Sequence, residues 1–369
     1  MHDHRGRHPG DAGAGGKGQW RAADGPLYRF RGRGCGPSVY IQANLHGAEV
    51  QGNAVIYQLL QLLPALERLG DISLVPMANP LGLNQKSGEF TLGRFDPVTG
   101  QNWNRLYADL RPDLDAFLAK HGQKEPDALK AAYRQALLTE LEQRLAEPLA
   151  LSTGRRLAMT LQRQALQADL VLDLHTGPVS ASHLYVPDYA RESARLFDIP
   201  HVLLIPNQFD GALDESVFCP WWRLGDALAE RGRALSLGVE AFTVELGSQE
   251  DIDLAEAGRQ AGSILAYLTR KGVIGDCPYQ PRDMVRHACL LRDYQAIHSP
   301  AGGFVQYLAR PGRPLPAGEP LARLLRLDGG GHARDITLER DVLPILHFAS
   351  ASVNQGTELY KVFTKPFAL

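Results

Sequence analysis

The chain has 369 residues, a formal net charge of −2 and a hydrophobic content of 44%. This composition is typical of a globular protein, and the length predicts about two domains, or one large domain with an appendage. The near-zero net charge excludes a strongly basic protein and gives no reason to expect nucleic acid or an anionic membrane surface as a partner.

The cysteine content and the hydropathy of the chain favour a cytoplasmic protein. The sequence contains four cysteines and no Cys-x-x-Cys pair, which argues against a disulfide framework. No uncharged apolar run reaches the length of a transmembrane helix, so we expect no membrane span. Residues 1–23 are polar and rich in glycine and histidine, and we expect a disordered tail there rather than a secretory signal.

Short apolar segments recur after this tail and are separated by helical patterns. Most of them lack strict alternation of polar and apolar residues, which is typical of strands buried on both faces. Strands that alternate with helices predict an α/β fold with a mixed, mainly parallel sheet and helices on both faces. The predicted strands are Ser38–Ala43, Ile72–Pro76, Leu170–Leu174, Val202–Ile205 and Ala241–Glu245, and the predicted helices are about Val50–Leu69, Asp214–Arg231 and Leu254–Arg270.

Two regions depart from this alternation. About residues 108–167 lack a strand signal and have apolar residues at helical spacing, which predicts two or three inserted helices that form a lid, a wall or an oligomer contact. Towards the end of the chain, proline and glycine become frequent and short apolar runs alternate with turn signals. We therefore assign residues 24–275 to an α/β domain and residues 276–369 to a small all-β domain.

The first candidate metal ligands follow the predicted strand that ends at Ala43. His46 and Glu49 are three residues apart, so they share a face of a helical turn, and Gly47 between them permits a sharp turn. Catalytic zinc takes three protein ligands and keeps a fourth position for water, and histidine nitrogen and carboxylate oxygen suit it. Taken alone, such a pair is more often two surface residues that never meet.

Two further candidates lie at the ends of other predicted strands. His175 follows one strand, and Asp173, two residues earlier on the same face, could orient its imidazole; in isolation this pattern is more often a buried histidine hydrogen-bonded inside the sheet. Glu245 ends another apolar strand, where a carboxylate is costly unless a polar group such as metal-bound water meets it. It is therefore a candidate general base, and the alternative is a glutamate that faces solvent or pairs with an arginine.

These candidates share one position relative to the predicted sheet. In an open α/β sheet, ligands bind beyond the carboxyl ends of the strands, and His46, His175 and Glu245 each lie at or just past such an end. Asn79–Pro80, which follows the predicted strand Ile72–Pro76, has the same position, and independent placement of all four by chance explains this poorly.

A separate segment carries groups that suit a substrate. Arg94 and Arg105 could each hold a carboxylate through the planar guanidinium fork. Asn104 and Arg105 could also polarise a scissile carbonyl. The alternative is a solvated loop with surface arginines.

Taken in chain order, these motifs resemble the succinylglutamate desuccinylase/aspartoacylase family, which is related to the zinc carboxypeptidases. The resemblance covers roughly residues 40–270. The matching segments are the His-Gly-x-Glu motif at His46–Glu49, Asn79–Pro80, Asn104–Arg105, the Asp-Leu-His-Thr-Gly motif at Asp173–Gly177 and the Val-Glu-Leu-Gly motif at Val244–Gly247.

The resemblance implies a phosphorylase/hydrolase-like α/β fold that binds one Zn²⁺ per chain. It implies that His46, Glu49 and His175 hold the zinc and that Glu245 is the catalytic carboxylate. It also implies that a small β domain follows the catalytic domain. The implied substrate-binding residues are Arg94, Asn104 and Arg105, of which Arg105 also assists catalysis.

The sequence departs from the family pattern in two places. Asn102 stands where the family often has aspartate, two residues before the Asn-Arg pair, and the helical insertion is unusually long for members that act on small substrates. Tyr360 is a weak candidate for a tyrosine near the family's C-terminus that contacts substrate. These differences affect the identity of the substrate rather than the zinc site.

The expected function is zinc-dependent hydrolysis of an amide bond other than a peptide bond, in an N-acyl amino acid or a related small substrate. One alternative is a metallocarboxypeptidase that acts on peptides, which an open groove would favour. The other is a non-catalytic binding protein on the same fold, which has no need of Glu245. Assembly into a homo-oligomer through the inserted helices is compatible with the sequence.

Overall fold

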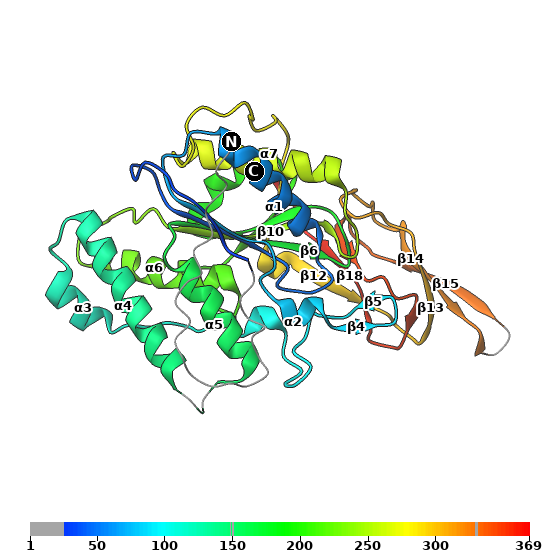
Figure 1. The fold of residues 1–369 in the computed structure, drawn as a ribbon. Helices are drawn as coiled ribbons and strands as arrows, with labels where there is room; N and C mark the ends of the chain where they lie inside the picture. The colour runs from blue at the N-terminus through cyan, green and yellow to red at the C-terminus, as the bar shows by residue number, and fades with distance from the viewer. Residues whose placement is uncertain (1–25, 148, 150, 329–330) are drawn as a thin grey trace, which may run out of the picture.

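A nine-stranded mixed sheet forms the centre of the protein (Figure 1). The computed structural model describes residues 26–147, 149, 151–328 and 331–369, so the expected tail at residues 1–23 lies outside the described residues. In spatial order the strands are β1 (Tyr28–Phe30), β3 (Ile72–Val75), β2 (Val39–Ala43), β6 (Leu170–Gly177), β10 (Glu240–Ser248), β8 (His183–Pro187), β9 (His201–Ile205), β11 (His287–Leu290) and β19 (Phe367–Ala368).

The central strands of this sheet are parallel. Strands β3, β2, β6 and β10 run in one direction, whereas β8, β9 and β11 are parallel to one another and antiparallel to β10. The carboxyl ends of β2, β6 and β10 therefore meet at one edge, where β8 begins. The predicted α/β fold class is confirmed, and the five predicted strands correspond to β2, β3, β6, β9 and β10.

Helices cover both faces of the sheet, as Figure 1 shows. On one face, α1 and α7 pack on alternate residues of the strands, such as Ile41 and Leu172. On the other face, α6 and the inserted helices pack on Tyr40 and Val171. The bounds are α1 (Gln51–Leu62), α6 (Leu213–Glu230) and α7 (Leu254–Arg270), with short helices α2 (Pro80–Leu83), η1 (Leu63–Ala65), η2 (Trp103–Arg105), η3 (Asp188–Leu196) and η4 (Leu291–Asp293).

The predicted insertion consists of three helices, which are α3 (Leu114–His121), α4 (Pro126–Ala146) and α5 (Thr153–Ala165). Asp169, at the start of β6, joins these helices to the sheet. Its Oδ1 lies 2.6 Å from Lys130 Nζ and 2.7 Å from Arg134 Nη2, both on α4. Its Oδ2 accepts a hydrogen bond from the Ser38 backbone at 2.9 Å. A single buried carboxylate thus connects α4, the segment before β2 and β6.

Two small antiparallel sheets follow the catalytic region. One has the order β12 (Tyr294–His298), β18 (Glu358–Phe363), β16 (Leu343–His347) and β7 (Val179–Ser180). The other has the order β15 (His332–Thr337), β14 (Pro320–Arg326), β13 (Gly303–Tyr307) and β17 (Ser352–Val353), and a separate hairpin consists of β4 (Lys86–Ser87) and β5 (Phe90–Thr91).

The chain after residue 275 is not confined to these small sheets. Strands β11 and β19 extend the large sheet beyond β9, and β7 from the catalytic region pairs with β16. A buried cluster that includes Leu321, Leu324 and Leu359 forms a separate core for the small sheets. We retain a boundary near Asp276 as a proposal, with the addition that the two regions share strands in both directions.

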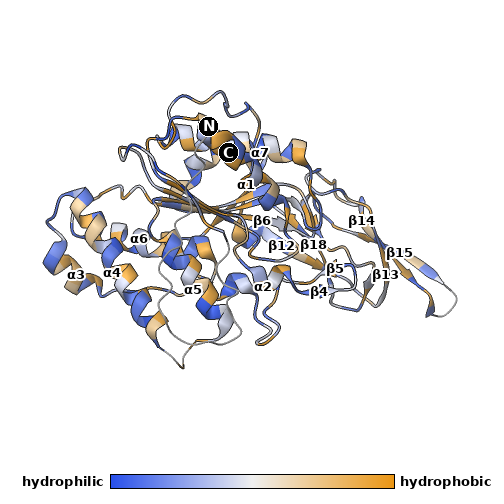
Figure 2. Cartoon of the chain, in the orientation of Figure 1, coloured by the Kyte–Doolittle hydropathy of each residue, from blue (hydrophilic) through white to orange (hydrophobic). Residues whose placement is uncertain are grey.

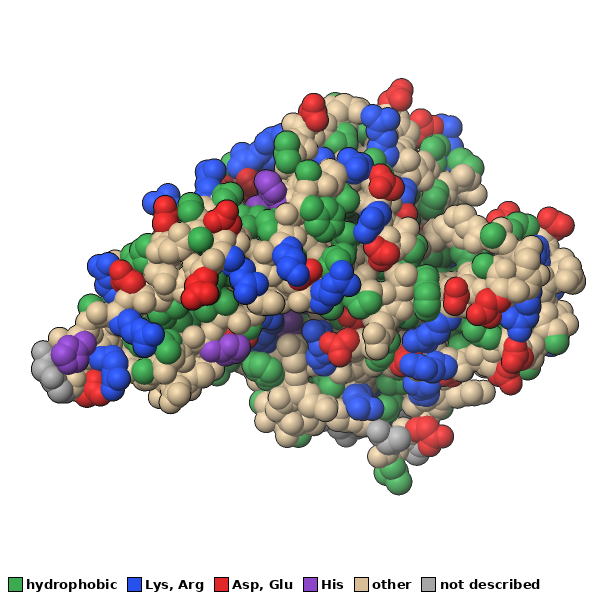
Figure 3. Space-filling model, turned by 180° about the vertical axis from the view of Figure 1, so that it is seen from behind, with side chains coloured by type: hydrophobic (Ala, Val, Ile, Leu, Met, Phe, Trp, Pro, Cys, Tyr) green, Lys and Arg blue, Asp and Glu red, His purple; other side chains and the backbone are tan. Residues whose placement is uncertain are grey.

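The distribution of polar groups agrees with the near-zero net charge. Apolar residues concentrate in the sheet and on the inner sides of the helices (Figure 2). On the face drawn in Figure 3, Lys or Arg side chains are interspersed with Asp or Glu, without a broad area of one sign. No helix within the described residues has the length and apolarity needed to cross a membrane.

Candidate metal centre and active site

Hydrogen bonds from Asn44 and a close backbone approach at Gly47 fix the loop that carries His46. Asn44, just after β2, has a left-handed conformation with φ of 65°, and its side-chain amide donates to the carbonyls of His46 and Gly47 at 3.1 and 3.2 Å. A Cβ atom on Gly47 would lie 2.1 Å from the carbonyl oxygen of Gly82, so no side chain fits there. This close approach directs His46 and Glu49 back toward the end of β6.

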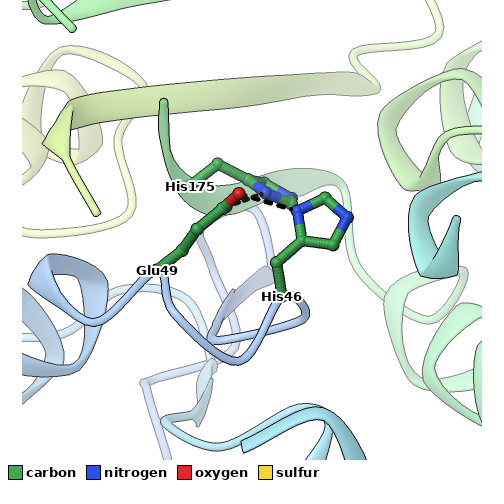
Figure 4. Close-up of side chains that lie close together, drawn as sticks. All are labelled: His46, Glu49 and His175. Atoms are coloured by element: carbon green, nitrogen blue, oxygen red, sulfur yellow. Dashed lines mark hydrogen bonds and ion pairs between the residues drawn. The ribbon is translucent and has the colours of Figure 1, made fainter. Parts of the chain in front are cut away.

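Three side chains from two distant parts of the chain converge near the carboxyl ends of β2 and β6 (Figure 4). The ligand atoms of His46, Glu49 and His175 all lie within 4.8 Å of one another. Glu49 Oε1 lies 2.8 Å from His46 Nδ1, and Glu49 Oε2 lies 2.7 Å from His175 Nδ1. All three side chains are buried, with exposed fractions of 2–4%.

The outer nitrogens of both histidines face oxygen atoms. His46 Nε2 lies 2.8 Å from Asn102 Oδ1, and His175 Nε2 lies 2.9 Å from Asp173 Oδ2. The Asn102 oxygen favours the His46 tautomer with hydrogen on Nε2, which leaves Nδ1 with a lone pair that points at Glu49. Asp173 Oδ2 is close to His175 Nε2, but the two atoms are not aligned for a hydrogen bond, and neither has such a partner among the described residues. A cation between Glu49 and the two Nδ1 atoms fits this cluster when both imidazoles carry hydrogen on Nε2.

The charges of this cluster are strongly coupled. Burial alone would raise the pKa of Glu49. The two histidines outweigh this effect and hold that pKa well below its usual value. Burial lowers the pKa of His46, whereas the carboxylates of Asp173 and Glu49 outweigh burial and raise that of His175. A low carboxylate pKa keeps Glu49 ionised, as a metal ligand requires.

A buried polar network supports His175 from below. Asp173 Oδ1 accepts a hydrogen bond from Gln42 Nε2 at 2.9 Å, and Gln42 Oε1 accepts one from the Tyr40 hydroxyl at 2.9 Å. Because these side chains are almost fully buried, each lost hydrogen bond would be costly. Such a network fixes the position of Asp173 and therefore the orientation of the His175 imidazole.

Glu245 lies directly beside the cluster. It pairs with His175 in the register of β10 and β6, so the two side chains project from the same face. Burial of its carboxyl group is the main cause that raises the pKa of Glu245 to about 7, and repulsion from Glu49 is the second cause. Its Oε2 is shielded from solvent and has no hydrogen-bond partner among the described residues. A carboxyl group poised near neutrality suits proton transfer.

Of the two arginines predicted to bind substrate, Arg94 contacts the cluster and Arg105 lies near Asp210. Arg94 donates to Glu49 Oε1 at 3.0 Å while its side chain remains 45% exposed. Arg105 is 48% exposed and lies 3.7 Å from Asp210. Asn104 is buried, and its Oδ1 accepts a hydrogen bond from the backbone of Leu213 at 3.3 Å, which joins η2 to the start of α6.

Comparison with known proteins agrees with this geometry. Residues 35–269 match the sequence model of the succinylglutamate desuccinylase/aspartoacylase catalytic domain, which is more than half of the chain. The chain belongs to the succinylglutamate desuccinylase/aspartoacylase family. No match was found among curated proteins.

Solved structures extend the similarity beyond the catalytic domain. A protein of this family from Shewanella amazonensis is 56% identical, with a TM-score of 0.91 over 93% of this chain and 95% of that one. A second, from Shewanella frigidimarina, is 54% identical, with a TM-score of 0.91 over 93% of each chain. The ectoine utilization protein EutE (DoeB) from Ruegeria pomeroyi, in a product-bound structure, shares the fold at 19% identity and a TM-score of 0.62 over 91% of this chain and 88% of that one.

The succinylglutamate desuccinylase/aspartoacylase motifs therefore lie where the sequence led us to expect them. His46, Glu49 and His175 meet, Glu245 is adjacent, and Arg94 is in direct contact with the cluster. The Asn79–Pro80 motif has a structural role. Asn79 Nδ2 donates a hydrogen bond to the Leu45 carbonyl at 2.9 Å and so stabilises the loop that carries His46.

Sequence reasoning missed the contact of Asn102 and the two tyrosines near Glu245, and it left the role of Tyr360 open. Asn102, noted only as a departure from the family pattern, contacts His46 directly. Tyr360 does not face the site, since it is buried in the small β region and its hydroxyl donates to the Ala309 carbonyl at 3.0 Å. Tyr185 and Tyr294 lie near Glu245 instead, and Glu245 contributes to the raised pKa of each. No local pattern around either tyrosine signals this.

Proposed function

We propose that this family member is a zinc-dependent deacylase that hydrolyses the amide bond of an N-acyl amino acid or a related small substrate. The observation that carries the proposal is the convergence of His46, Glu49 and His175 beside Glu245. Membership of a family named for the removal of acyl groups from amino acids supports the reaction class.

The ligand set suits zinc better than magnesium or calcium. Two imidazole nitrogens and one carboxylate match a catalytic zinc site, whereas the other two ions prefer oxygen ligands. When bound, the ion would polarise the amide carbonyl and acidify a water molecule. The chain's own contribution is to hold three buried ligands close together, to orient His46 through Asn102 and to place the charge of Asp173 beside His175.

Glu245 is proposed to move the protons of the reaction. Its ionised carboxylate accepts a proton from the attacking water and then donates that proton to the departing amine nitrogen. The raised pKa of its carboxyl group favours both steps. A carboxyl group with a pKa near the working pH can accept a proton from water and can also give that proton to the amine. The unpartnered Oε2 gives the transferred proton a place to reside.

The arginines are proposed to bind and orient the substrate. Arg105 is half exposed and can form paired hydrogen bonds with the carboxylate of the amino acid. Asn104 fixes the position of Arg105 through its link to α6. Arg94, which contacts Glu49, is placed to stabilise the negative charge that develops on the carbonyl oxygen.

Metal analysis together with a substrate screen tests this function. The zinc-loaded protein is incubated with N-acetyl, N-succinyl and longer-chain N-acyl amino acids and with short peptides, and the products are identified by mass spectrometry. We expect about one zinc per chain and release of a free amino acid from an N-acyl compound. Exclusive cleavage of C-terminal peptide bonds would favour the carboxypeptidase alternative, and zinc binding without turnover of any compound would favour a binding protein.

A cytoplasmic location is part of the proposal. All four cysteines lie within the described residues and all are free thiols, three of them buried. Reduced thiols are expected where glutathione and thioredoxin act. A small molecule, rather than a nucleic acid or a membrane, is the partner that the site suits.

A further inference from the structure

Two residues that follow β10 contact both segments that carry the candidate metal ligands. The Gln249 N–H donates to the Gly177 carbonyl at 2.8 Å, at the end of β6. The Glu250 N–H donates to the Ala48 carbonyl at 2.8 Å, in the loop that holds the other two ligands. Because β10 also carries Glu245, these two hydrogen bonds attach the strand of the candidate base to both parts of the metal centre.

The backbone of Glu250 has a conformation that few residues with a side chain adopt. Its φ of 58° lies in the left-handed region, where a Cβ atom crowds the neighbouring carbonyl oxygen and glycine is favoured. Within the described part of the chain, Asn44 is the other residue with a side chain and a positive φ. Asparagine tolerates this region, whereas glutamate gains nothing from it locally. We therefore looked for a contact that the glutamate side chain makes and glycine could not.

The carboxylate of Glu250 accepts a hydrogen bond from the Thr91 N–H at 2.8 Å. Thr91 lies on β5, in the two-stranded hairpin of β4 and β5 (Figure 1). Leu92 donates to the Gln85 carbonyl at 2.8 Å across this hairpin. In an antiparallel ladder the next pair, Lys86 and Thr91, then directs its backbone groups outward. The Thr91 N–H consequently points away from β4, and Glu250 is its acceptor.

The residues that follow Thr91 lead directly to the metal centre. The Gly93 carbonyl accepts a hydrogen bond from the Gly47 N–H at 2.9 Å. A Cβ atom on Gly93 would lie 2.7 Å from the Cα atom of Gly47, so the two backbones are in close contact. Arg94 comes next in the chain, and its guanidinium group donates to Glu49 Oε1 at 3.0 Å. Residues 91–94 thus reach the ligand loop through one backbone contact and one side-chain contact.

The position of Arg94 depends on how firmly this segment is held. Its side chain is 45% exposed, so solvent competes for the guanidinium group and weakens its pair with Glu49. A long side chain also loses rotamer freedom when it is kept in one place. In the proposed reaction Arg94 stabilises charge that develops on the carbonyl oxygen, and a displacement of about 1 Å at such a position can cost about 100-fold in rate. An anchor at Thr91, three residues earlier, limits this displacement.

We propose that Glu250 is a positioning residue of the active site, whose carboxylate holds Thr91 so that Arg94 stays in contact with Glu49 and in place for the reacting carbonyl. This role rests on the proposed deacylase function. Glu250 acts through Arg94 and does not itself bind the substrate. Its backbone N–H holds the ligand loop at Ala48 at the same time, so one residue sets the distance between the Arg94 segment and the metal centre.

Hydrogen–deuterium exchange of the zinc-loaded full-length protein tests the anchor without any turnover. Glu250→Ala removes the acceptor, so the Thr91 amide, followed in the peptide of residues 86–94, should exchange about tenfold faster or more, as expected for the loss of one hydrogen bond to a charged group. Glu250→Gln keeps an oxygen that can accept this N–H and should keep most of the protection. Unchanged exchange in Glu250→Ala would overturn the proposal.

Two further variants exclude indirect effects on this exchange. Glu250→Gly removes the carboxylate and also relieves the backbone strain, so it should show the same faster exchange in a protein that folds. Asp251→Ala removes the neighbouring exposed carboxylate and should exchange at the wild-type rate. Equal acceleration in Asp251→Ala would count against Glu250, because negative charge in general, rather than this contact, would then protect the segment.

A double-mutant cycle, run with the substrate found in the screen, separates the positioning of Arg94 from a merely structural role. Glu250→Ala should lower kcat by about 10–100-fold with KM nearly unchanged, because Arg94 acts on the transition state. Zinc content should stay at the wild-type level, and Glu250→Gln should recover most of the rate. In an Arg94→Ala background the same change should have little further effect. Equal losses in both backgrounds would refute the role, since Glu250 would then act independently of Arg94.

The two proposals fail separately in these experiments. Hydrolysis of N-acyl amino acids together with wild-type exchange and wild-type kcat in Glu250→Ala refutes the role of Glu250 alone. Faster exchange in Glu250→Ala without hydrolysis of any compound refutes the deacylase function and leaves the anchoring of the Arg94 segment in place.

Discussion

The imidazole of His46 contacts an uncharged partner, whereas that of His175 contacts a charged one. Asn102 offers a carbonyl oxygen 2.8 Å from His46 Nε2, and Asp173 offers a carboxylate oxygen 2.9 Å from His175 Nε2. The Asn102 oxygen can accept a hydrogen bond from His46, whereas Asp173 is not aligned for one and adds negative charge that increases the basicity of the His175 ring. Asn102 would therefore act on a bound metal through the position of His46 rather than through charge.

This difference predicts the effect of removing Asn102. In Asn102→Ala, His46 keeps Glu49 as a neighbour but loses the partner that orients it, so zinc affinity should fall by about 10–100-fold. Competition with a chromophoric chelator measures this affinity independently of catalysis. Asn354→Ala, an exposed asparagine in the small β region, should leave it unchanged. An unaltered affinity in Asn102→Ala would show that the loop alone positions His46.

Glu245 can be separated from metal binding because it is not one of the three converging ligands. Glu245→Gln keeps the shape of the side chain but cannot accept a proton, so we expect zinc content equal to wild type and turnover reduced by about 10²–10⁴-fold. Zinc is measured by mass spectrometry of the metal and turnover with the substrate found in the screen. Normal turnover in this variant would rule out the assigned role.

At the scale of elements, the inserted helices are held by charge as well as by apolar packing. Asp169 contacts Lys130 and Arg134 on α4 and the backbone of Ser38. Although burial opposes ionisation, Lys130, Ser38 and Arg134 together lower the pKa of Asp169 to about 2. The side chain of Asp169 is only 13% exposed, so solvent screens these contacts little.

Asp169→Asn should therefore reduce stability in a pH-dependent way. A carboxyl group whose folded pKa is about 2 and whose unfolded pKa is about 3.9 stabilises the fold fully above pH 4 and loses this contribution as pH falls toward 2. The shift corresponds to roughly 2–3 kcal/mol at pH 7. Urea unfolding at pH 7 should show this loss, and the wild type and the variant should converge near pH 2.

Asp226→Asn is the control for this measurement, because Asp226 is exposed on α6. It should unfold at the wild-type urea concentration at every pH. An Asp169→Asn protein as stable as wild type at pH 7 would mean that apolar packing alone holds the insertion.

At the scale of the whole molecule, the candidate zinc site joins segments that are far apart in sequence. His46 and Glu49, in the loop between β2 and α1, meet His175 near the end of β6. A ligand that binds only the folded state raises stability by about 4 kcal/mol at a thousandfold excess over its dissociation constant. For a chain of this size that corresponds to a rise of several degrees in Tm.

Removal of zinc by a chelator should therefore lower the Tm, and added zinc should restore it. His46→Ala should show neither effect, because one of three ligands is missing, and its Tm should be near that of the chelated wild type. Differential scanning calorimetry measures all three states. A zinc-dependent Tm that persists in His46→Ala would place the ion elsewhere on the protein.

Local sequence determined much of this architecture. Apolar runs without alternation identified β2, β3, β6, β9 and β10, because buried strands need such residues wherever they lie in the sheet. Helical spacing identified α6 and α7 and the inserted helices. The first helix was predicted too long: α1 ends at Leu62, and Pro64, which lacks an N–H group to continue an α-helix, lies in the short helix η1.

Other features depend on contacts that no local pattern records. Strand β8 is short and follows a turn, and it became a strand because β10 and β9 lie on either side of it. The pairing of β11 and β19 with the large sheet brings together segments about 80 residues apart. Neither pairing follows from the hydropathy of the segments themselves.

The sequence by itself determined the fold class and the ligand motifs, since strand periodicity and the spacing of His46 and Glu49 are local properties of the chain. Only the tertiary structure decided that these ligands meet His175 within 4.8 Å and that Asn102 contacts His46. The physical reason is that distance and burial depend on how strands pair across the whole sheet, and the sequence specifies that pairing only through all of its contacts at once.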